Sequence, residues 1–194
     1  MALELSVRPL TVALLLGTVL IAGCDRQSEP QPQANATTLA EPKGPEPTGK
    51  LDIAQRGAAA PADSFLDPDG KPVTLAAFKG RPVLVNLWAT WCGPCVREMP
   101  TLDHVADRAG DRLKVLTVSQ DTKDVDIGPT FTKGGFKHLE RYRDPDNKLG
   151  FAFNTGMLPT TVLYDKDGKE VWRVIGAMDW NGPRANTLLA EYIG

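Results

Sequence analysis

Apolar residues at two different spacings predict the strands and helices of the second half of the chain. The segment Val83–Trp88 is a short apolar run rich in β-branched residues, which is typical of a strand buried in a parallel sheet. Behind it, apolar residues recur every three or four positions up to about Ala109, which predicts an amphipathic helix. A second apolar run follows at 113–119, so these residues predict one strand–helix–strand unit with a right-handed crossover.

Turn-forming residues predict the remaining strands. Asp69-Gly70 predicts a small hairpin over 65–73, and Asp167-Gly168 predicts a hairpin that joins strands at about 160–164 and 171–174. A final helix is expected at about 182–192. The alternation of strands and helices favours the α/β class, with a mixed central sheet flanked by helices.

The residues between Ser119 and Pro159 predict further elements. We expect a helix after Thr122 that is broken near Gly128-Pro129, a short strand around 139–142 and a helix near 147–153.

The amino terminus has the pattern of a signal peptide. Residues 10–23 form an apolar run after Arg8. As a helix this run would be about 21 Å long, against roughly 30 Å of hydrocarbon in a bilayer, so residues 1–23 are interpreted as a signal peptide. Residues 21–24, Ile-Ala-Gly-Cys, resemble a bacterial lipobox, which would leave Cys24 as the lipidated first residue. The alternative is a plain secretory signal with a stray cysteine.

The next segment is rich in polar residues and proline. Residues 24–62 contain few large apolar side chains, so they are predicted to form a disordered linker after the lipidated cysteine, and 63–194 to form the folded domain. Asp25 resembles the signal that retains lipoproteins in the inner membrane of Gram-negative bacteria. The formal net charge is only −2, and nothing in the charge pattern indicates a nucleic-acid partner.

Two closely spaced cysteines carry the chemistry. In Trp91-Cys92-Gly93-Pro94-Cys95 the cysteines lie where the buried strand ends and the helix begins. Unpaired N–H groups and the helix dipole at that place stabilise a Cys92 thiolate, which indicates a redox-active dithiol. Half of a zinc site is one alternative, although no second cysteine pair or paired histidines follow. A structural disulfide is another, although so short a loop would constrain the unfolded chain very little.

Two blocks of sequence carry a family resemblance. Residues 85–100, Val-Asn-Leu-Trp-Ala-Thr-Trp-Cys-Gly-Pro-Cys-Val-Arg-Glu-Met-Pro, and residues 158–168, Leu-Pro-Thr-Thr-Val-Leu-Tyr-Asp-Lys-Asp-Gly, resemble the thioredoxin superfamily. Within it they are similar to the membrane-anchored bacterial branch typified by TlpA and ResA. The resemblance covers about 62–194 and implies a thioredoxin-like fold with an N-terminal hairpin and a central insertion. In such relatives the insertion borders the active-site groove; the alternative is that it merely extends the sheet.

The resemblance and the local chemistry assign roles around the cysteines. Cys92 is expected to be the nucleophile, and Cys95, one turn further along, to resolve the mixed disulfide. Gly93 permits a tight turn and Pro94 begins the helix without losing a needed hydrogen bond. Together with Trp91, these two residues are predicted to contact the substrate; the alternative for Trp91 is that it packs beside the motif.

A second loop is expected to complete the site. Pro159 matches the cis-proline that faces the dithiol in the family, and Leu158 is expected to offer backbone groups to an extended substrate. The chain departs from the family at Met157, where relatives commonly have glycine, while Gly156 stands one position earlier.

Glu98 is a candidate proton carrier. Asn86 occupies the position of the buried aspartate of cytosolic thioredoxin, so that proton acceptor is missing. Glu98 lies near the helix face that carries both cysteines, where a partly buried carboxylate would exchange protons with Cys95. The alternative is a solvated charge in the first turns of a helix.

These observations predict a lipid-anchored thiol–disulfide oxidoreductase on the periplasmic side of the inner membrane. No metal or cofactor is expected beyond the Cys92–Cys95 redox disulfide. The expected partners are exported proteins that carry disulfides or dithiols, and a membrane thiol reductant that recharges the enzyme. By resemblance, the substrates are apocytochrome c or the copper-site cysteines of a respiratory oxidase. The alternatives are a periplasmic disulfide oxidant and a copper chaperone that uses the dithiol.

Overall fold

The computed structural model describes residues 47–193. The expected signal peptide, the Cys24 lipidation site and the first part of the linker lie outside the described residues. None of the helices between residues 47 and 193 is long and apolar enough to cross a bilayer.

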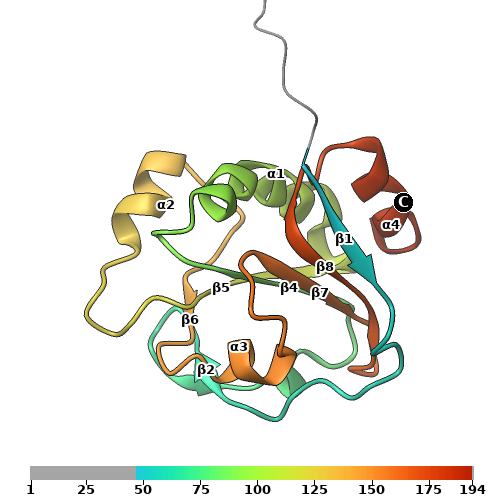
Figure 1. Cartoon of the computed structure of the whole chain (residues 1–194), viewed down its shortest axis with the longest axis horizontal. Coiled ribbons are helices and arrows are strands. Elements are labelled where there is room, and N and C mark those ends of the chain that lie inside the picture. Colours follow the sequence, from blue (N-terminus) through green and yellow to red (C-terminus); the bar gives the residue numbers. More distant parts are fainter. Residues whose placement is uncertain (1–46, 194) are drawn as a thin grey trace, which may run out of the picture. The chain divides into compact units, whose positions relative to one another are not determined.

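One mixed sheet organises the described chain (Figure 1). Its strands lie in the order β1-β8-β7-β4-β5-β6-β2-β3. The central strand β4 pairs with β5 in parallel and with β7 antiparallel. The strands are β1 (Thr48–Asp52), β2 (Phe65–Leu66), β3 (Pro72–Val73), β4 (Val83–Trp88), β5 (Lys114–Ser119), β6 (Tyr142–Arg143), β7 (Thr160–Tyr164) and β8 (Glu170–Met178).

Helices cover both faces of this sheet. The long helix α1 and the final helix α4 pack on one face and α3 on the other, as Figure 1 shows. Each face has its own apolar core. The helices are η1 (Leu75–Phe78), α1 (Gly93–Ala109), η2 (Gly110–Arg112), α2 (Gly128–Gly134), α3 (Lys148–Phe153) and α4 (Pro183–Ile193).

Strand β4 supplies side chains to both cores. Leu84 and Trp88 belong to the core under α1, whereas Val85 and Leu87 belong to the core over α3. Because successive side chains of a strand point to opposite faces, Asn86 shares the α1 face with Leu84 and Trp88. The buried strand therefore brings one polar side chain beneath the helix that carries the cysteines.

The structure confirms the thioredoxin-like α/β fold and most of the expected elements. The strand–helix–strand unit is β4-α1-β5, with its two strands parallel and adjacent. The hairpin around Gly70 is β2–β3, and the hairpin around Gly168 joins β7 to β8. Strand β8 is longer than expected because β1 pairs along its outer edge as far as Met178.

The prediction of a disordered linker up to residue 62 was wrong for residues 48–62. Strand β1 pairs antiparallel with β8, and Ala59 forms a bridge with Lys169. This order comes from backbone hydrogen bonds to a strand more than a hundred residues away in the sequence. The polar side chains of β1 give no local sign of that pairing.

The predicted helix after Thr122 was also misplaced. Helix α2 begins at Gly128, with Pro129 in its first turn, so this proline starts a helix instead of breaking one. The short strand predicted at 139–142 is displaced to β6, which pairs with both β5 and β2. The central insertion therefore extends the sheet.

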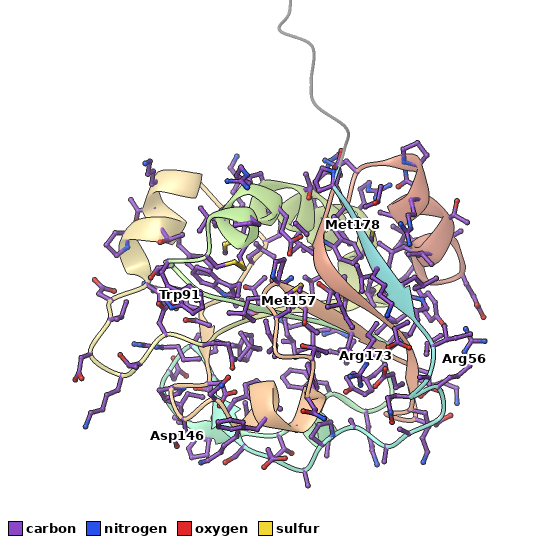
Figure 2. The ribbon with its side chains drawn as sticks, in the orientation of Figure 1. Arg56, Trp91, Asp146, Met157, Arg173 and Met178 are labelled. Carbon is purple, nitrogen blue, oxygen red and sulfur yellow. A yellow bond between two sulfur atoms is a disulfide. The ribbon has the colours of Figure 1, made fainter. Side chains whose placement is uncertain are left out.

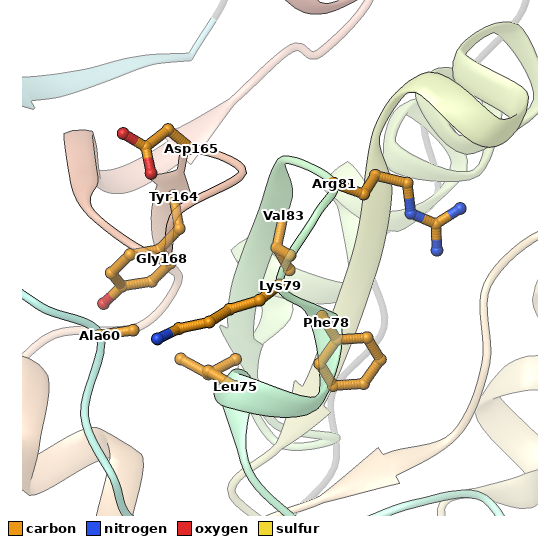
Figure 3. A pocket seen from close by; sticks show the side chains of 9 residues that line it. All are labelled: Ala60, Leu75, Phe78, Lys79, Arg81, Val83, Tyr164, Asp165 and Gly168. Carbon is orange, nitrogen blue, oxygen red and sulfur yellow. The ribbon is translucent and has the colours of Figure 1, made fainter.

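A small cavity lies beside the end of β7 (Figure 3). Its volume is about 10 Å³, and it is lined by side chains that include Leu75, Phe78 and Tyr164. This is about the space of one water molecule. The cavity is therefore a packing feature and offers no room for a substrate.

Candidate active site

The two cysteines of the motif form a disulfide at the start of α1 (Figure 2). The Cys92–Cys95 bond is 2.03 Å long, and Cys92 is the N-cap residue of the helix. The Cys95 backbone N–H donates to Cys92 Sγ at 3.3 Å. Cys92 keeps 6% of its surface exposed, whereas Cys95 is fully buried. Once the bond is reduced, the free N–H groups of the helix start stabilise a thiolate on Cys92, the more accessible sulfur.

Three residues predicted to contact the substrate surround this disulfide. Trp91 is 73% exposed, and Gly93 and Pro94 are also exposed at the first positions of α1. An exposed indole beside a buried Cys92 is available for contact with another molecule. The motif therefore presents an apolar and accessible rim around a nearly covered sulfur.

The loop before β7 has the predicted cis-proline. The Leu158–Pro159 peptide bond is cis. Leu158 packs against the apolar core that contains both cysteines. No hydrogen bond joins the Leu158 N–H or C=O to another residue of the described chain. These backbone groups are free to pair with an extended peptide, as an edge strand does.

Met157, where relatives commonly have glycine, lies in a loop that is held by hydrogen bonds of two threonine hydroxyls. Gly156 takes the left-handed φ of +64°, which glycine adopts without strain. Thr160 Oγ1 donates to the Met157 carbonyl at 2.8 Å, and Thr155 Oγ1 lies 2.8 Å from Thr160 Oγ1. The loop is thereby fixed, and the Met157 side chain remains 54% exposed (Figure 2).

Glu98 is buried one turn after Cys95. It is only 4% exposed, which contradicts the alternative of a solvated charge. Its Oε1 accepts a hydrogen bond from Asn86 Nδ2 at 2.7 Å, and its Oε2 accepts one from the Met178 N–H at 2.9 Å. Burial raises the pKa of Glu98 from 4.5 to about 7, although the bonds from Met178 and Asn86 oppose this shift. A carboxyl group with this pKa can gain or lose a proton near neutral pH.

A buried ion pair lies where α3 ends and the cis-proline loop begins. Arg173 of β8 donates through Nε and Nη2 to both oxygens of Glu170, at 2.7 and 2.6 Å. Its Nη1 donates to the Phe153 carbonyl at 2.7 Å, at the end of α3 where the loop begins. No local sequence pattern predicts this pair, since nothing local distinguishes its residues from the charged surface positions of a strand.

Asp121 was also missed, although it is 1% exposed and bonded to the turn before Cys92. The signal for Asp121 in the sequence is the polar run Ser119-Gln120-Asp121 at the end of a buried strand. Between residues 47 and 193, no group of three histidine, cysteine or acidic side chains could hold a metal ion.

Comparison with known proteins agrees with this geometry. The Redoxin family model matches residues 55–189. The thiol-disulfide oxidoreductase ResA of Bacillus thuringiensis is 32% identical over 123 residues, covering 63% of this chain and 70% of the relative. ResA of Bacillus subtilis is 30% identical over 131 residues, covering 67% and 72%.

Solved structures share the fold. A putative DsbE interchange protein from Chlorobium tepidum has a TM-score of 0.64 at 23% identity, over 75% of this chain and all of that one. The exposed lipoprotein thioredoxin Etrx1 of Streptococcus pneumoniae has a TM-score of 0.56 at 30% identity, over 66% and 98%. A cysteine pair at a helix start, a cis-proline loop whose Leu158 packs against the core that contains both cysteines, and these matches lead to one conclusion. The chain belongs to the Redoxin family and is a thioredoxin-like thiol–disulfide oxidoreductase.

Proposed function

We propose that this oxidoreductase is lipid-anchored through Cys24 on the periplasmic side of the inner membrane, where it reduces disulfides of specific exported proteins. A membrane thiol reductant returns it to the dithiol form. The substrates proposed are the haem-binding cysteines of apocytochrome c or the copper-site cysteines of a respiratory oxidase.

The reaction transfers two electrons from the dithiol to the substrate. The Cys92 thiolate attacks one substrate sulfur, which breaks the substrate disulfide, forms a mixed disulfide and releases the first substrate thiolate. Cys95 then loses its proton and attacks Cys92 Sγ, which releases the second substrate thiolate and restores the Cys92–Cys95 disulfide. Each released thiolate takes a proton from the surroundings.

Buried Glu98 is the observation that carries the dithiol chemistry of this proposal. Cys95 is fully buried, so water cannot easily accept its proton during the second step. Glu98 lies one helical turn away with a pKa of about 7, so its carboxyl group can gain or lose a proton near neutral pH. Its carboxylate accepts the Cys95 proton and makes Cys95 a nucleophile when the mixed disulfide must be resolved.

The two residues between the cysteines favour a reductant over an oxidant. Gly93 and Pro94 place no cation or imidazole between the two sulfurs. Strong oxidants of this class owe their potential to a reduced form in which the thiolate is greatly stabilised. Here the helix terminus supplies that stabilisation without an added charge from the two residues, so the disulfide is comparatively stable.

Two observations support the anchor. Residues 21–24 have the order of a lipobox, and one solved relative, from Streptococcus pneumoniae, is described as an exposed lipoprotein. Acyl chains on Cys24 would contribute about 0.8 kcal/mol for each buried CH₂ group, so two or more chains give stable attachment.

Substrate trapping tests the proposal. In cells that express the full chain with Cys95→Ser, the mixed disulfide on Cys92 is not resolved, and exported proteins with cysteine pairs should be captured. The matched control, Cys92→Ser with Cys95→Ser, should capture none. In cells without the enzyme, the captured proteins should accumulate in the disulfide form. Accumulation in the dithiol form instead would show that the enzyme is an oxidant.

A further inference from the structure

The carboxylate of Asp121 holds the turn that leads to the disulfide. Asp121 follows the last residues of β5 and is 1% exposed. Its Oδ2 accepts from the Thr90 backbone N–H at 2.9 Å, and its Oδ1 accepts from the Thr90 hydroxyl at 2.7 Å. Ser119 Oγ donates to Oδ2 at 2.8 Å and accepts from the Asp121 N–H at 3.0 Å. One buried side chain therefore binds both donors of Thr90.

This contact fixes the segment between β4 and α1. Strand β4 ends at Trp88, and the Cys92 N–H donates to the Ala89 carbonyl at 3.1 Å to close a turn. Thr90 lies in the middle of that turn. Directly before the turn, the Trp88 carbonyl accepts a hydrogen bond from the Gln120 N–H at 2.7 Å. The turn that carries Cys92 is thus attached to the end of β5 by three hydrogen bonds.

A carboxylate is a costly group for this place. Burying an ionised group is strongly unfavourable unless hydrogen bonds compensate, and an apolar side chain would fill the same space without that cost. Here all three neighbouring donors point to the carboxylate, so its lone pairs are well satisfied. Its use in place of an apolar group indicates a role in orienting the turn.

That role matters most when the disulfide is open. In the oxidised protein the Cys92–Cys95 bond itself holds Cys92 against the helix. In the reduced protein this covalent link is gone, and the turn of residues 89–92 has to keep the Cys92 sulfur close to Cys95. The closer the two sulfurs are held, the more the disulfide is favoured over two free thiols.

We propose that Asp121 is a positioning residue of the redox reaction, which holds the Cys92 turn in the reduced state through Thr90 and thereby favours re-formation of the Cys92–Cys95 disulfide. This inference rests on the oxidoreductase activity alone. It holds whichever direction electrons flow in the cell.

The test is the equilibrium of the full chain with glutathione, in a Cys24→Ser background where Cys92 and Cys95 are the remaining thiols. Asp121→Asn should shift this equilibrium about tenfold toward the dithiol, which is about 30 mV in reduction potential. Thr90→Val keeps the carboxylate charge and removes one hydrogen bond, so it should shift the equilibrium in the same direction by a smaller factor. Thr90→Ser retains both donors and should match the parent.

A second buried carboxylate provides the matched control. Asp144 is also 1% exposed and accepts from the backbone N–H groups of Lys148 and Leu149 at the start of α3. Asp144→Asn should lower the melting temperature and leave the glutathione equilibrium within twofold of the parent. The proposal is overturned if Asp121→Asn behaves like this control, or if Thr90→Val stays within twofold. Thr90→Val decides the question by itself should Asp121→Asn fail to fold.

Discussion

Glu98 and Asn86 are hydrogen-bonded between helix α1 and the sheet: Asn86 Nδ2 donates to Glu98 Oε1 at 2.7 Å, and both side chains are buried. Asn86 comes from the central strand β4 and Glu98 from α1. By the family resemblance, Asn86 is an amide where cytosolic thioredoxin has its buried aspartate; in this structure the helix supplies the carboxyl group. This exchange leaves one acidic group near Cys95, and its protonation should be visible in the stability of the protein.

Stability of the oxidised protein should therefore fall as the pH rises through neutrality. The pKa of Glu98 is raised from 4.5 to about 7, so the folded state binds more protons than the unfolded state between these values. The stabilisation is complete below pH 4.5 and lost above pH 7, and at 1.36 kcal/mol per pKa unit it amounts to about 3 kcal/mol. The measurement is the free energy of urea unfolding, for the parent and for Glu98→Gln, at several pH values from 4.5 to 8. Equal pH dependence in both proteins would contradict the assignment.

Glu98→Gln should also slow resolution of the mixed disulfide. A glutamine cannot accept the Cys95 proton, so we expect a loss of about 10²-fold near neutral pH, the lower end of the range for general-base catalysis. The first step, attack by Cys92, should change little. Stopped-flow measurement of the two phases with a disulfide peptide separates them, and equal slowing of both phases would argue for a structural role instead.

Alkylation should distinguish the two cysteines. In the reduced protein with Cys24→Ser, iodoacetamide near neutral pH should modify Cys92 well before Cys95. Cys92 retains 6% of its surface and lies at the helix start, whereas Cys95 is fully covered. Peptide mass spectrometry at short times identifies the labelled residue. Preferential labelling of Cys95 would reverse the roles assigned to the two sulfurs.

The reduction potential should lie near that of thioredoxin, roughly −270 mV, and far from the roughly −120 mV of a strong oxidant. The Gly93-Pro94 pair contributes no positive charge to the Cys92 thiolate. Equilibration with defined glutathione or dithiothreitol ratios gives the value. A potential above about −180 mV would favour the oxidant alternative.

Breaking the buried ion pair of β8 should strongly destabilise the fold. Arg173→Met leaves Glu170, which is 3% exposed, without its partner, and the expected loss is about 3–5 kcal/mol of unfolding free energy. The double variant with Glu170→Leu should recover much of this loss. As a control, Lys148→Ala removes an exposed pair with Asp146 and should change stability by less than about 1 kcal/mol. Similar losses in Arg173→Met and Lys148→Ala would be inconsistent with a buried pair.

Cys24→Ser should release the protein from the membrane. If Cys24 carries the acyl chains, the variant should lose its lipid label and leave the detergent-requiring fraction. Fractionation with radiolabelled palmitate measures both effects. Attachment that persists in the variant would mean that residues 10–23 serve as an uncleaved anchor.

The sequence by itself determined the elements whose signals are local. The apolar run of Val83–Trp88, the helical spacing behind it and the two Asp-Gly turns predicted β4, α1 and both hairpins, because strand and helix periodicity are properties of neighbouring residues. Cys92 and Cys95 were identifiable for the same reason, since their chemistry depends on a spacing within one turn. Pro159 could be assigned only because a second block resembled the family.

Tertiary structure decided the features that depend on partners far along the chain. Strand β1 is ordered by hydrogen bonds to β8, and Glu98 is buried because Asn86 and the Met178 N–H reach it from two strands. Asp121 likewise meets Thr90 only where β4 and β5 end side by side. Burial and its effect on a charge are set by what packs around a side chain. No window of local sequence contains that information.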